Sequence, residues 1–187
     1  MARQIIFQQT GKLWDRKQVK ITAFGMIYGM GAPALSGELG ESQHVAREVT
    51  AAYKRAIPGV QLMQDGTKRR GRSGQPIRTW GGREIYVEPP GMVKGQYRTF
   101  EYKLLNYLIQ GSAADQTKQC IIEWNNHRSA NNIFMATVHD EINISVPADH
   151  VEEGMEELRI CMDEVCEFDV PMLSEGFTGP TWGEVDE

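Results

Sequence analysis

The sequence predicts an α+β fold, in which a helical lobe precedes a lobe that contains an antiparallel sheet. Apolar residues recur at helical intervals before residue 70, and strand-like runs occur only after residue 76. A stretch rich in Gly, Ser and Arg at 71–75 separates the two patterns, so we place the lobes at 1–72 and 73–187. With 187 residues and 41% hydrophobic content, the chain is long enough to bury a core.

The first lobe is expected to consist of helices. Residues 14–29 form the first of them, with Asp15 near its start and Gly29 suited to its end. Residues 41–59 carry Ala, Val and Tyr at helical intervals and end in a Pro-Gly pair. The next stretch begins with a helical pattern and then breaks up in glycine, serine and arginine, which is typical of a boundary between lobes.

The second lobe is expected to mix strands and helices. Two short runs about a Gly-Gly pair indicate a hairpin, strict alternation indicates the later strands, and apolar residues spaced three and four apart indicate the helices. The expected elements are a hairpin in 77–87, a long helix at 99–124, paired strands at 132–138 and 142–146, an amphipathic helix at 147–165 and an extended segment at 168–176.

Charge and cysteine content narrow the class of protein. Residues 1–103 hold 17 Lys and Arg against 8 Asp and Glu, whereas the remainder holds 3 against 17. This division indicates one region that meets a polyanion and another that binds cations or is simply solvated. No apolar run is long enough to span a membrane, and three cysteines without CxxC spacing support neither a disulfide framework nor a zinc site. We therefore expect a cytoplasmic protein without a signal peptide.

Two cations and two aromatic residues share one face of the first helix. Arg16, Lys20, Phe24 and Tyr28 are spaced four apart, and successive members of such a series drift only about 40° around a helix. An Arg fork and a Lys charge suit a polyphosphate, and an aromatic ring one turn later can pack against a sugar or base. A solvated basic turn beside a buried apolar turn would give the same pattern. Gly25 inside the helix indicates close approach, either by a base or by a neighbouring helix.

Two further polar groups stand out. Asn106 and Gln110 lie four apart on the long helix, where carboxamides could reach the edges of bases, although exposed Asn and Gln are common. His139, Asp140 and Glu141 fall at or near a hairpin turn between the paired strands. A carboxylate at such a turn is either solvated or bound to a cation, and an ordinary polar turn is the alternative.

Taken together and in their order along the chain, the three motifs resemble those of family A DNA polymerases of the DNA polymerase I type. RKQVKITAFGMIYG is similar to that family's motif B, VHDE to its motif C, and NYLIQGSAAD to the segment between them. Ser112, where threonine is more usual, is a mild departure. The resemblance implies a helical fingers lobe to about residue 72, followed by a palm with an antiparallel sheet and a long helix.

The resemblance also implies how the first helix would bind an incoming deoxynucleoside triphosphate. Arg16 and Lys20 would grip its triphosphate, with Lys20 also assisting catalysis. Phe24 would lie against the sugar, and Tyr28 would help to check the nascent base pair.

For the other motifs, the resemblance implies contacts with primer-template DNA and with metal. Asn106, Gln110 and His139 would contact the DNA. Asp140 would bind the catalytic Mg²⁺ or Mn²⁺ ions, and Glu141 would support that site. Such enzymes join a deoxynucleotide to the primer 3′ end by two-metal nucleotidyl transfer.

One departure from the family is serious. The second metal-binding aspartate belongs to motif A, upstream of motif B, and no other aspartate of this chain has a matching strand context; those considered are Asp15, Asp65, Asp115, Asp149, Asp163, Asp169 and Asp186. We therefore expect the isolated chain to polymerise poorly, and to act with an N-terminal polymerase fragment that supplies motif A and the thumb.

Several alternatives to a split polymerase subunit stay open. The chain could be a fragment of a longer enzyme, or a remnant that binds DNA or nucleotide without catalysis. A single-subunit RNA polymerase shares the Lys and Tyr-Gly of the first helix and the His-Asp of the turn. Phe24, Glu141 and QGSAAD favour the DNA enzyme over it.

Overall fold

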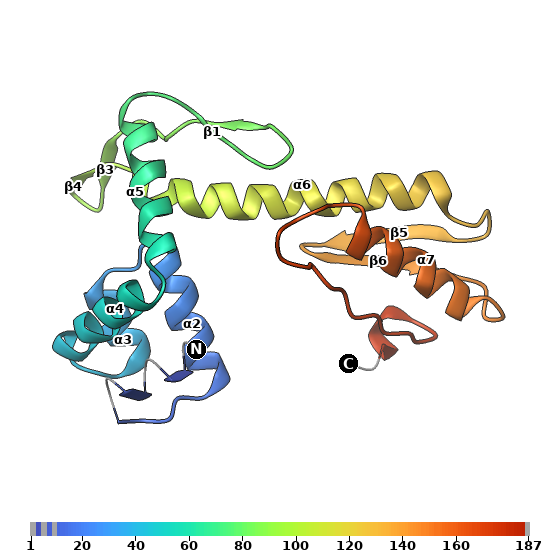
Figure 1. Ribbon diagram of the computed structural model, residues 1–187, viewed down its shortest axis with the longest axis horizontal. Coiled ribbons are helices and arrows are strands. Elements are labelled where there is room, and N and C mark those ends of the chain that lie inside the picture. The colour runs from blue at the N-terminus through green and yellow to red at the C-terminus, as the bar shows by residue number, and fades with distance from the viewer. Residues whose placement is uncertain (1–2, 5–6, 9–10, 186–187) are drawn as a thin grey trace. The chain divides into compact units, whose positions relative to one another are not determined.

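In the computed structural model, residues 3–4, 7–8 and 11–185 are described. They form two compact units, Met1–Gln110 and Gly111–Glu187 (Figure 1). The helices are α2 (Arg16–Ile27), α3 (Ala32–Leu39), α4 (Gln43–Ala56), α5 (Pro58–Arg72), α6 (Leu104–His127) and α7 (Val151–Glu164), with 3-10 turns η1 (Glu101–Lys103) and η2 (Trp182–Glu184). Mixed helices and small antiparallel sheets confirm the predicted α+β class.

Helix α2 begins and ends where its sequence predicts. Asp15 is the N-cap, and it forms a capping box with Gln18: the Gln18 amide donates to the Asp15 carboxylate at 2.7 Å, and the Asp15 amide donates to the Gln18 side chain at 3.2 Å. Gly29 has φ +83°, a conformation that glycine adopts without the usual steric cost. The buried Gln64 of α5 donates to the carbonyls of Met26 and Ile27, at 2.8 Å each, and so satisfies the free end of α2.

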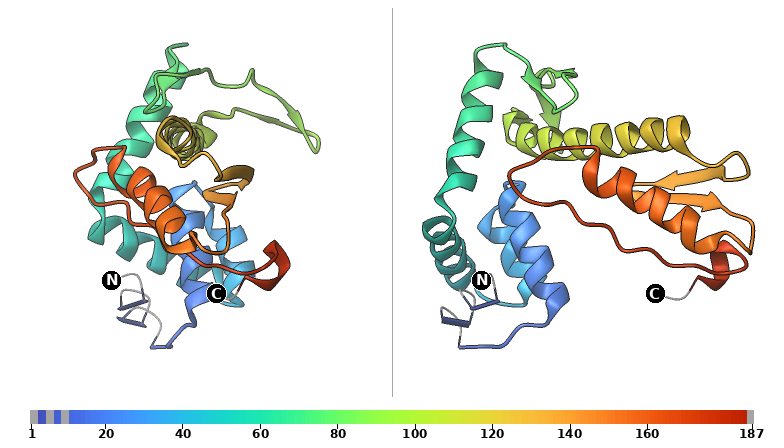
Figure 2. Two further views of the ribbon diagram at one scale, coloured as in Figure 1. Left: turned by 90° about the vertical axis from the view of Figure 1, so that its right-hand side faces the viewer. Right: turned by 45° about the vertical axis from the view of Figure 1, so that its right-hand side comes forward.

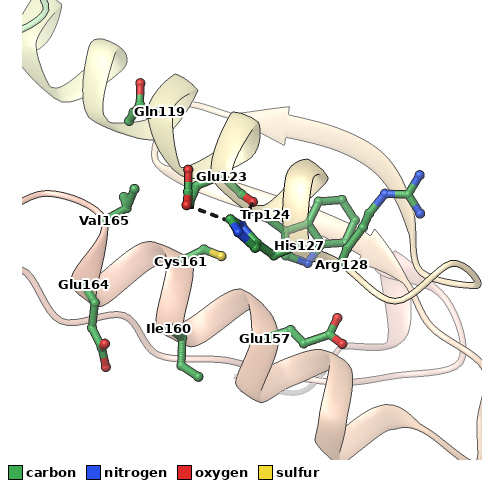
Figure 3. Close-up of a pocket in the computed structure, with 10 residues that line it drawn as sticks. All are labelled: Gln119, Glu123, Trp124, His127, Arg128, Glu157, Ile160, Cys161, Glu164 and Val165. Carbon is green, nitrogen blue, oxygen red and sulfur yellow. Dashed lines mark hydrogen bonds and ion pairs between the residues drawn. The ribbon is translucent and has the colours of Figure 1, made fainter.

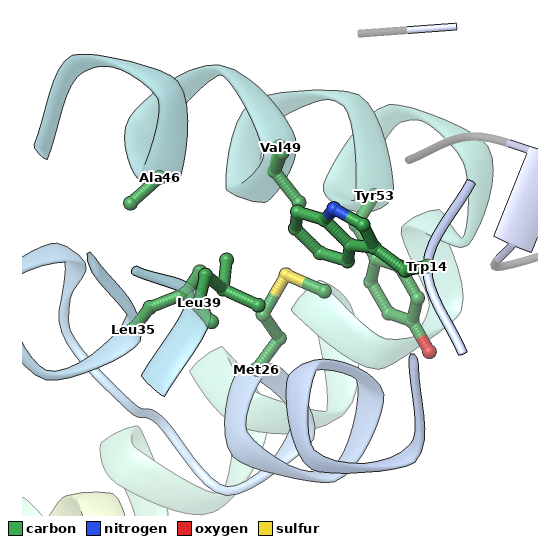
Figure 4. Packing of buried hydrophobic residues seen from close by; sticks show 7 residues of the cluster. All are labelled: Trp14, Met26, Leu35, Leu39, Ala46, Val49 and Tyr53. Carbon is green, nitrogen blue, oxygen red and sulfur yellow. The ribbon is translucent and has the colours of Figure 1, made fainter. Parts of the chain in front are cut away.

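A short helix that the sequence analysis did not predict completes the first core. Helix α3 begins with Pro33 at its second position, where the missing amide hydrogen costs nothing, and ends at Gly40 in the left-handed conformation. It packs against α2 and α4, and Figure 4 shows the resulting buried cluster. The cluster consists of Trp14, Met26, Leu35, Leu39, Ala46, Val49 and Tyr53. This core fixes α2 in unit 1.

Two small hairpins connect α5 to α6. The predicted hairpin is present as β1 (Ile77–Arg78) and β2 (Glu84–Ile85). A second hairpin, β3 (Gly91–Val93) with β4 (Gln96–Arg98), was not predicted. Its turn residues, Lys94 and Gly95, both have positive φ, as two-residue hairpin turns commonly do.

The first turns of α6 are held to the preceding loop by one carboxylate. Lys103 donates to Glu88 at 2.8 and 3.0 Å, and the Tyr107 hydroxyl donates to the same carboxylate at 2.5 Å. The hydrogen bond from Lys103 is the main reason why the pKa of Glu88 lies below its usual range. This contact anchors the part of α6 that carries Asn106 and Gln110.

Unit 2 packs one hairpin and one helix against the second half of α6. Strands β5 (Ile133–Val138) and β6 (Glu141–Ser145) pair antiparallel, and α7 lies alongside them (Figures 1 and 2). The core of this unit consists of Cys120, Trp124, Ile142, Leu158 and Cys161. The segment 168–176, predicted as extended, belongs to no strand of the described chain.

Within the part of the chain that the structure describes, no helix is both long and apolar enough to cross a membrane.

Candidate functional site

The face of α2 singled out in the sequence is exposed except at the half-buried Tyr28, and its aromatic rings are stacked. Lys20 Nζ lies 5.8 Å from the centre of the Phe24 ring. The rings of Phe24 and Tyr28 are stacked, with centres 6.1 Å apart and planes inclined by 6°. Arg16 and Lys20 are both exposed, and the described residues offer neither of them an ion-pair partner. The two cations are therefore available to an anion, and a flat aromatic surface continues from them.

A hydrogen bond joins this face to the second motif. Gln110 Nε2 donates to the Tyr28 hydroxyl at 2.9 Å, across 82 positions of sequence. Asn106, one turn earlier on α6, is half-buried, and its carboxamide oxygen is buried without a hydrogen-bond partner among the described residues. The structure thus brings Gln110 to the aromatic end of the α2 face.

Gly25 is close-packed by the chain itself. A Cβ at this position would lie 2.8 Å from Met30 Cε and 2.9 Å from its sulfur. Of the two explanations for a glycine here, packing within the protein accounts for the observed surroundings. The neighbour is Met30 of the loop that follows α2, and not a side chain of another helix.

The charged trio of the third motif lies at a two-residue hairpin turn. Val138 pairs with Glu141 across the ladder, so His139 and Asp140 form the turn. His139 has φ +57°, a left-handed conformation that costs a residue with a Cβ about 1 kcal/mol or more. Both turn residues are exposed, and Asp140 makes no hydrogen bond or ion pair with the described residues. Glu141, which was expected near the turn, is the first residue of β6.

Glu141 is held from two sides. Its backbone carbonyl accepts a hydrogen bond from the Thr137 hydroxyl at 3.0 Å. Its side-chain carboxylate accepts one from the indole N–H of Trp182 at 3.2 Å. Trp182 was not among the residues predicted for the site, because it lies 41 positions away and no spacing pattern links the two.

The described residues provide an incomplete set of metal ligands. Asp140 is a suitable single ligand, since Mg²⁺ is bound in proteins through one or two carboxylates together with substrate phosphates. No three His, Cys, Asp or Glu side chains gather as a metal site within the described part of the chain. Asp15 caps α2 and Asp163 accepts hydrogen bonds from Ser174, so both are engaged elsewhere. Asp186 lies outside the described residues.

A separate cavity of about 640 Å³ lies between α6 and α7 (Figure 3). Two carboxylates of its lining have partners: His127 Nδ1 lies 3.3 Å from the Glu123 carboxylate, and Glu157 accepts hydrogen bonds from Ser129 and Asn132. Burial raises the pKa of Glu157, but these hydrogen bonds outweigh burial and hold the pKa below its ordinary value. The lining of this cavity is thus held by hydrogen bonds within unit 2.

Comparison with known families shows which family carries these motifs. The model of DNA polymerase family A matches residues 4–184, nearly the whole chain. This chain belongs to DNA polymerase family A.

Similar proteins of this family are longer than the present chain. It is 30% identical over 185 residues to DNA polymerase theta of Caenorhabditis elegans, covering 96% of this chain and 12% of that protein. It is 32% identical over 172 residues to DNA polymerase I of Deinococcus radiodurans, covering 90% and 18%. The chain thus spans less than a fifth of these two relatives.

The fold of the family A chain is also found in a solved polymerase structure. The POL domain of Pol1 from M. smegmatis, in complex with DNA primer-template and dNTP, superposes with a TM-score of 0.76 at 23% identity. The match covers 91% of this chain and 32% of that one.

The predicted site residues are divided between the two units of the chain. The first unit contains Arg16, Lys20, Phe24, Tyr28, Asn106 and Gln110, and the second contains His139, Asp140 and Glu141. Convergence of the two groups around one nucleotide stays a prediction.

Proposed function

We propose that this chain forms the fingers and part of the palm of a template-directed DNA polymerase, with the functional boundary near residue 72. The observation that carries the proposal is the bond of 2.9 Å between Gln110 and Tyr28. It joins motif B to the downstream segment in one surface that presents two free cations and two stacked rings. The structural neighbour's complex with primer-template and dNTP supports the choice of ligands.

In this proposal, the α2 face binds the deoxynucleoside triphosphate. Arg16 and Lys20 would contact the phosphates, where their charge lowers the energy of the anionic transition state, and Lys20 would contribute directly to catalysis. Phe24 would cover the sugar. Tyr28, whose position is fixed by Gln110, would lie where the new base pair is formed.

The acidic turn would act at the primer end. Asp140 would hold Mg²⁺ or Mn²⁺, and Glu141 beside it would support that site. Such ions, when bound, lower the pKa of the primer hydroxyl and neutralise charge on the phosphates. His139 and Asn106 would contact the primer-template, alongside Gln110. The left-handed backbone of His139 supports a functional turn, because strained conformations cluster at such sites.

A further polypeptide, either an upstream segment or a partner chain, would complete the palm. Strand β5 exposes 56% of Ile133 and 39% of Phe134, and consecutive residues of a strand face opposite sides. Both faces of β5 are therefore uncovered within the described chain, and a two-stranded hairpin alone is marginally stable. A strand that carries the motif A aspartate would add a partner for the sheet and the missing metal ligand together.

Membership of a DNA polymerase family favours deoxynucleotides over the ribonucleotides of an RNA polymerase. The cysteines support a reducing, cytoplasmic setting, because all three are free and buried.

The test is primer extension by this chain combined with the polypeptide that supplies motif A and the thumb. We expect extension with deoxynucleotides, and a fall of about 100-fold or more in rate for Asp140→Ala, because bound metal contributes several kcal/mol to such reactions. Asp149→Ala is the matched control, since Asp149 is also an exposed aspartate of unit 2 and is expected to leave the rate unchanged. Unaltered extension by Asp140→Ala would remove the proposed metal role, and no extension by the wild-type combination would favour a non-catalytic remnant.

A second pair of variants tests the fingers face. Lys20→Ala is expected to raise the KM for dNTP about tenfold, the effect of losing roughly 1 to 2 kcal/mol of Coulomb attraction near a protein surface. Lys54→Ala removes an exposed lysine from α4, another helix of the same unit, and is expected to have little effect. Equal effects of the two changes would mean that only net charge matters.

A further inference from the structure

The segment that follows α7 is tied to the body of unit 2. The Asp163 carboxylate of α7 accepts hydrogen bonds from both the amide and the hydroxyl of Ser174, at 2.8 and 2.7 Å. The bonds from Ser174 are the main reason why the pKa of Asp163 lies below its ordinary value. The tail, residues 167–185, is therefore fixed at its middle, and Figure 1 shows it in red as it leaves α7.

Beyond that anchor, the tail folds back tightly on itself. A Cβ at Gly179 would lie 2.5 Å from the carbonyl oxygen of Glu184 and 2.9 Å from the amide nitrogen of Val185. Both atoms belong to the backbone and cannot rotate away. The Thr181 hydroxyl donates to the Glu184 carboxylate at 2.7 Å, closing η2. The tail thus holds η2, and with it Trp182, in a defined conformation.

The indole of Trp182 makes a specific polar contact and buries little of its ring. Its N–H donates to Glu141 Oε1 at 3.2 Å, while the residue keeps 65% of its surface exposed. An aromatic residue that served mainly for packing would bury most of its ring, because the stabilisation is proportional to the area removed from water. The hydrogen bond to the carboxylate is therefore the distinctive interaction at this position.

We propose that Trp182 is a positioning residue for the acidic turn, and that its N–H holds the Glu141 carboxylate in one orientation beside Asp140. One oxygen of Glu141 is occupied by the indole, which leaves the other free to face a divalent cation or its hydration water. Partners of this kind, outside the direct ligands, commonly orient a metal site and tune its affinity. The use of this cation in DNA synthesis rests on the function proposed above, but the hydrogen bond and its effect on cation binding do not.

The first test measures Mn²⁺ binding to the 187-residue chain alone, by the electron paramagnetic resonance signal of free Mn²⁺. The site is defined as the binding that Asp140→Ala removes. Trp182→Phe keeps a ring of similar character and removes the donor, so we expect the affinity of that site to fall about tenfold. Trp80→Phe makes the same change in unit 1 and is expected to leave the affinity unchanged. Equal affinity for Trp182→Phe and wild type, or no binding that depends on Asp140, would overturn the proposal.

The second test observes the contact directly. The indole N–H of Trp182 gives a nuclear magnetic resonance signal that Trp182→Phe assigns by its disappearance. Glu141→Gln, which removes the negative acceptor, is expected to shift that signal and leave the Trp80 signal in place. An unmoved Trp182 signal would refute the hydrogen bond. If both tests succeed and the reconstituted chain still fails to extend primers, the polymerase proposal fails and the positioning role stands.

Discussion

Gly154 of α7 allows a quantitative test of how unit 2 is packed. A Cβ at this position would lie 2.8 Å from both γ methyl groups of Val146 and 3.3 Å from Asn132 Nδ2. Because the valine is branched at Cβ and blocks the space with both methyls, rotation of its side chain offers little relief. Asn132 donates to Glu157 at 2.8 Å, so a shift of its amide would also weaken that bond.

The expected effect of Gly154→Ala is a loss of about 2 kcal/mol in the free energy of unfolding of unit 2. Overpacking a core costs about 1 to 3 kcal/mol, and weakening a hydrogen bond to a charged group adds about 1 kcal/mol. Alanine recovers about 1 kcal/mol through its higher helix propensity. The packing terms therefore exceed the gain in propensity.

Hydrogen exchange of peptides from α7 and β6, measured by mass spectrometry, reports this free energy for unit 2 alone. Gly66→Ala is the matched control, because Gly66 is also inside a helix and its Cβ would meet nothing within 4 Å. We expect the control to stabilise α5 by up to about 1 kcal/mol. If Gly154→Ala proved as stable as wild type while the control behaved as expected, the close packing of α7 on Val146 would be refuted.

Three further outcomes are expected. Gly25→Ala would change the stability of unit 1 by less than about 1 kcal/mol in urea unfolding, because the flexible thioether of Met30 can move aside and alanine favours the helix; a loss above 2 kcal/mol would show that this packing is rigid. The pKa of Asp163 is lowered in the folded protein, so its contribution is fully present above the unfolded value of 3.8 and is lost as the pH falls through the folded pKa. The urea midpoint of unit 2 would therefore fall less steeply with acid in Ser174→Ala than in wild type, and parallel curves would contradict this. Burial raises the pKa of Cys120 to about 12, so iodoacetamide at neutral pH would label it only after unfolding, and rapid labelling of the native chain would contradict its burial.

The sequence predicted most reliably the elements whose signals are local. Both ends of helix α2 could be predicted, because the capping carboxylate of Asp15 and the positive φ of Gly29 act within one turn of the helix. The hairpin turn at His139 followed from alternation in the flanking strands. The predicted stop of the second helix at Pro58 is confirmed, because α4 ends at Ala56, and Pro58 also begins α5, since proline is favoured at a first helical position.

The parts that were missed depend on weak or distant signals. Helix α3 has only eight residues, too few for a clear period, and it is stabilised by the core that it shares with Trp14 and Val49. The second hairpin could have been suspected from Gly95, since a glycine at the second position of a two-residue turn easily adopts the positive φ that the turn needs. The contacts of Gln110 with Tyr28 and of Trp182 with Glu141 join residues 82 and 41 positions apart, and no periodicity within one element reports such distances.

The backbone of His139 has a consequence for anyone who randomises this position. With φ at +57°, glycine or asparagine would adopt the turn more easily than histidine does. A library selected for thermal tolerance alone would therefore drift away from histidine, while a library selected for nucleotide incorporation would be expected to restore it. The difference in histidine frequency between the two selected populations would measure how much the imidazole contributes to the proposed function.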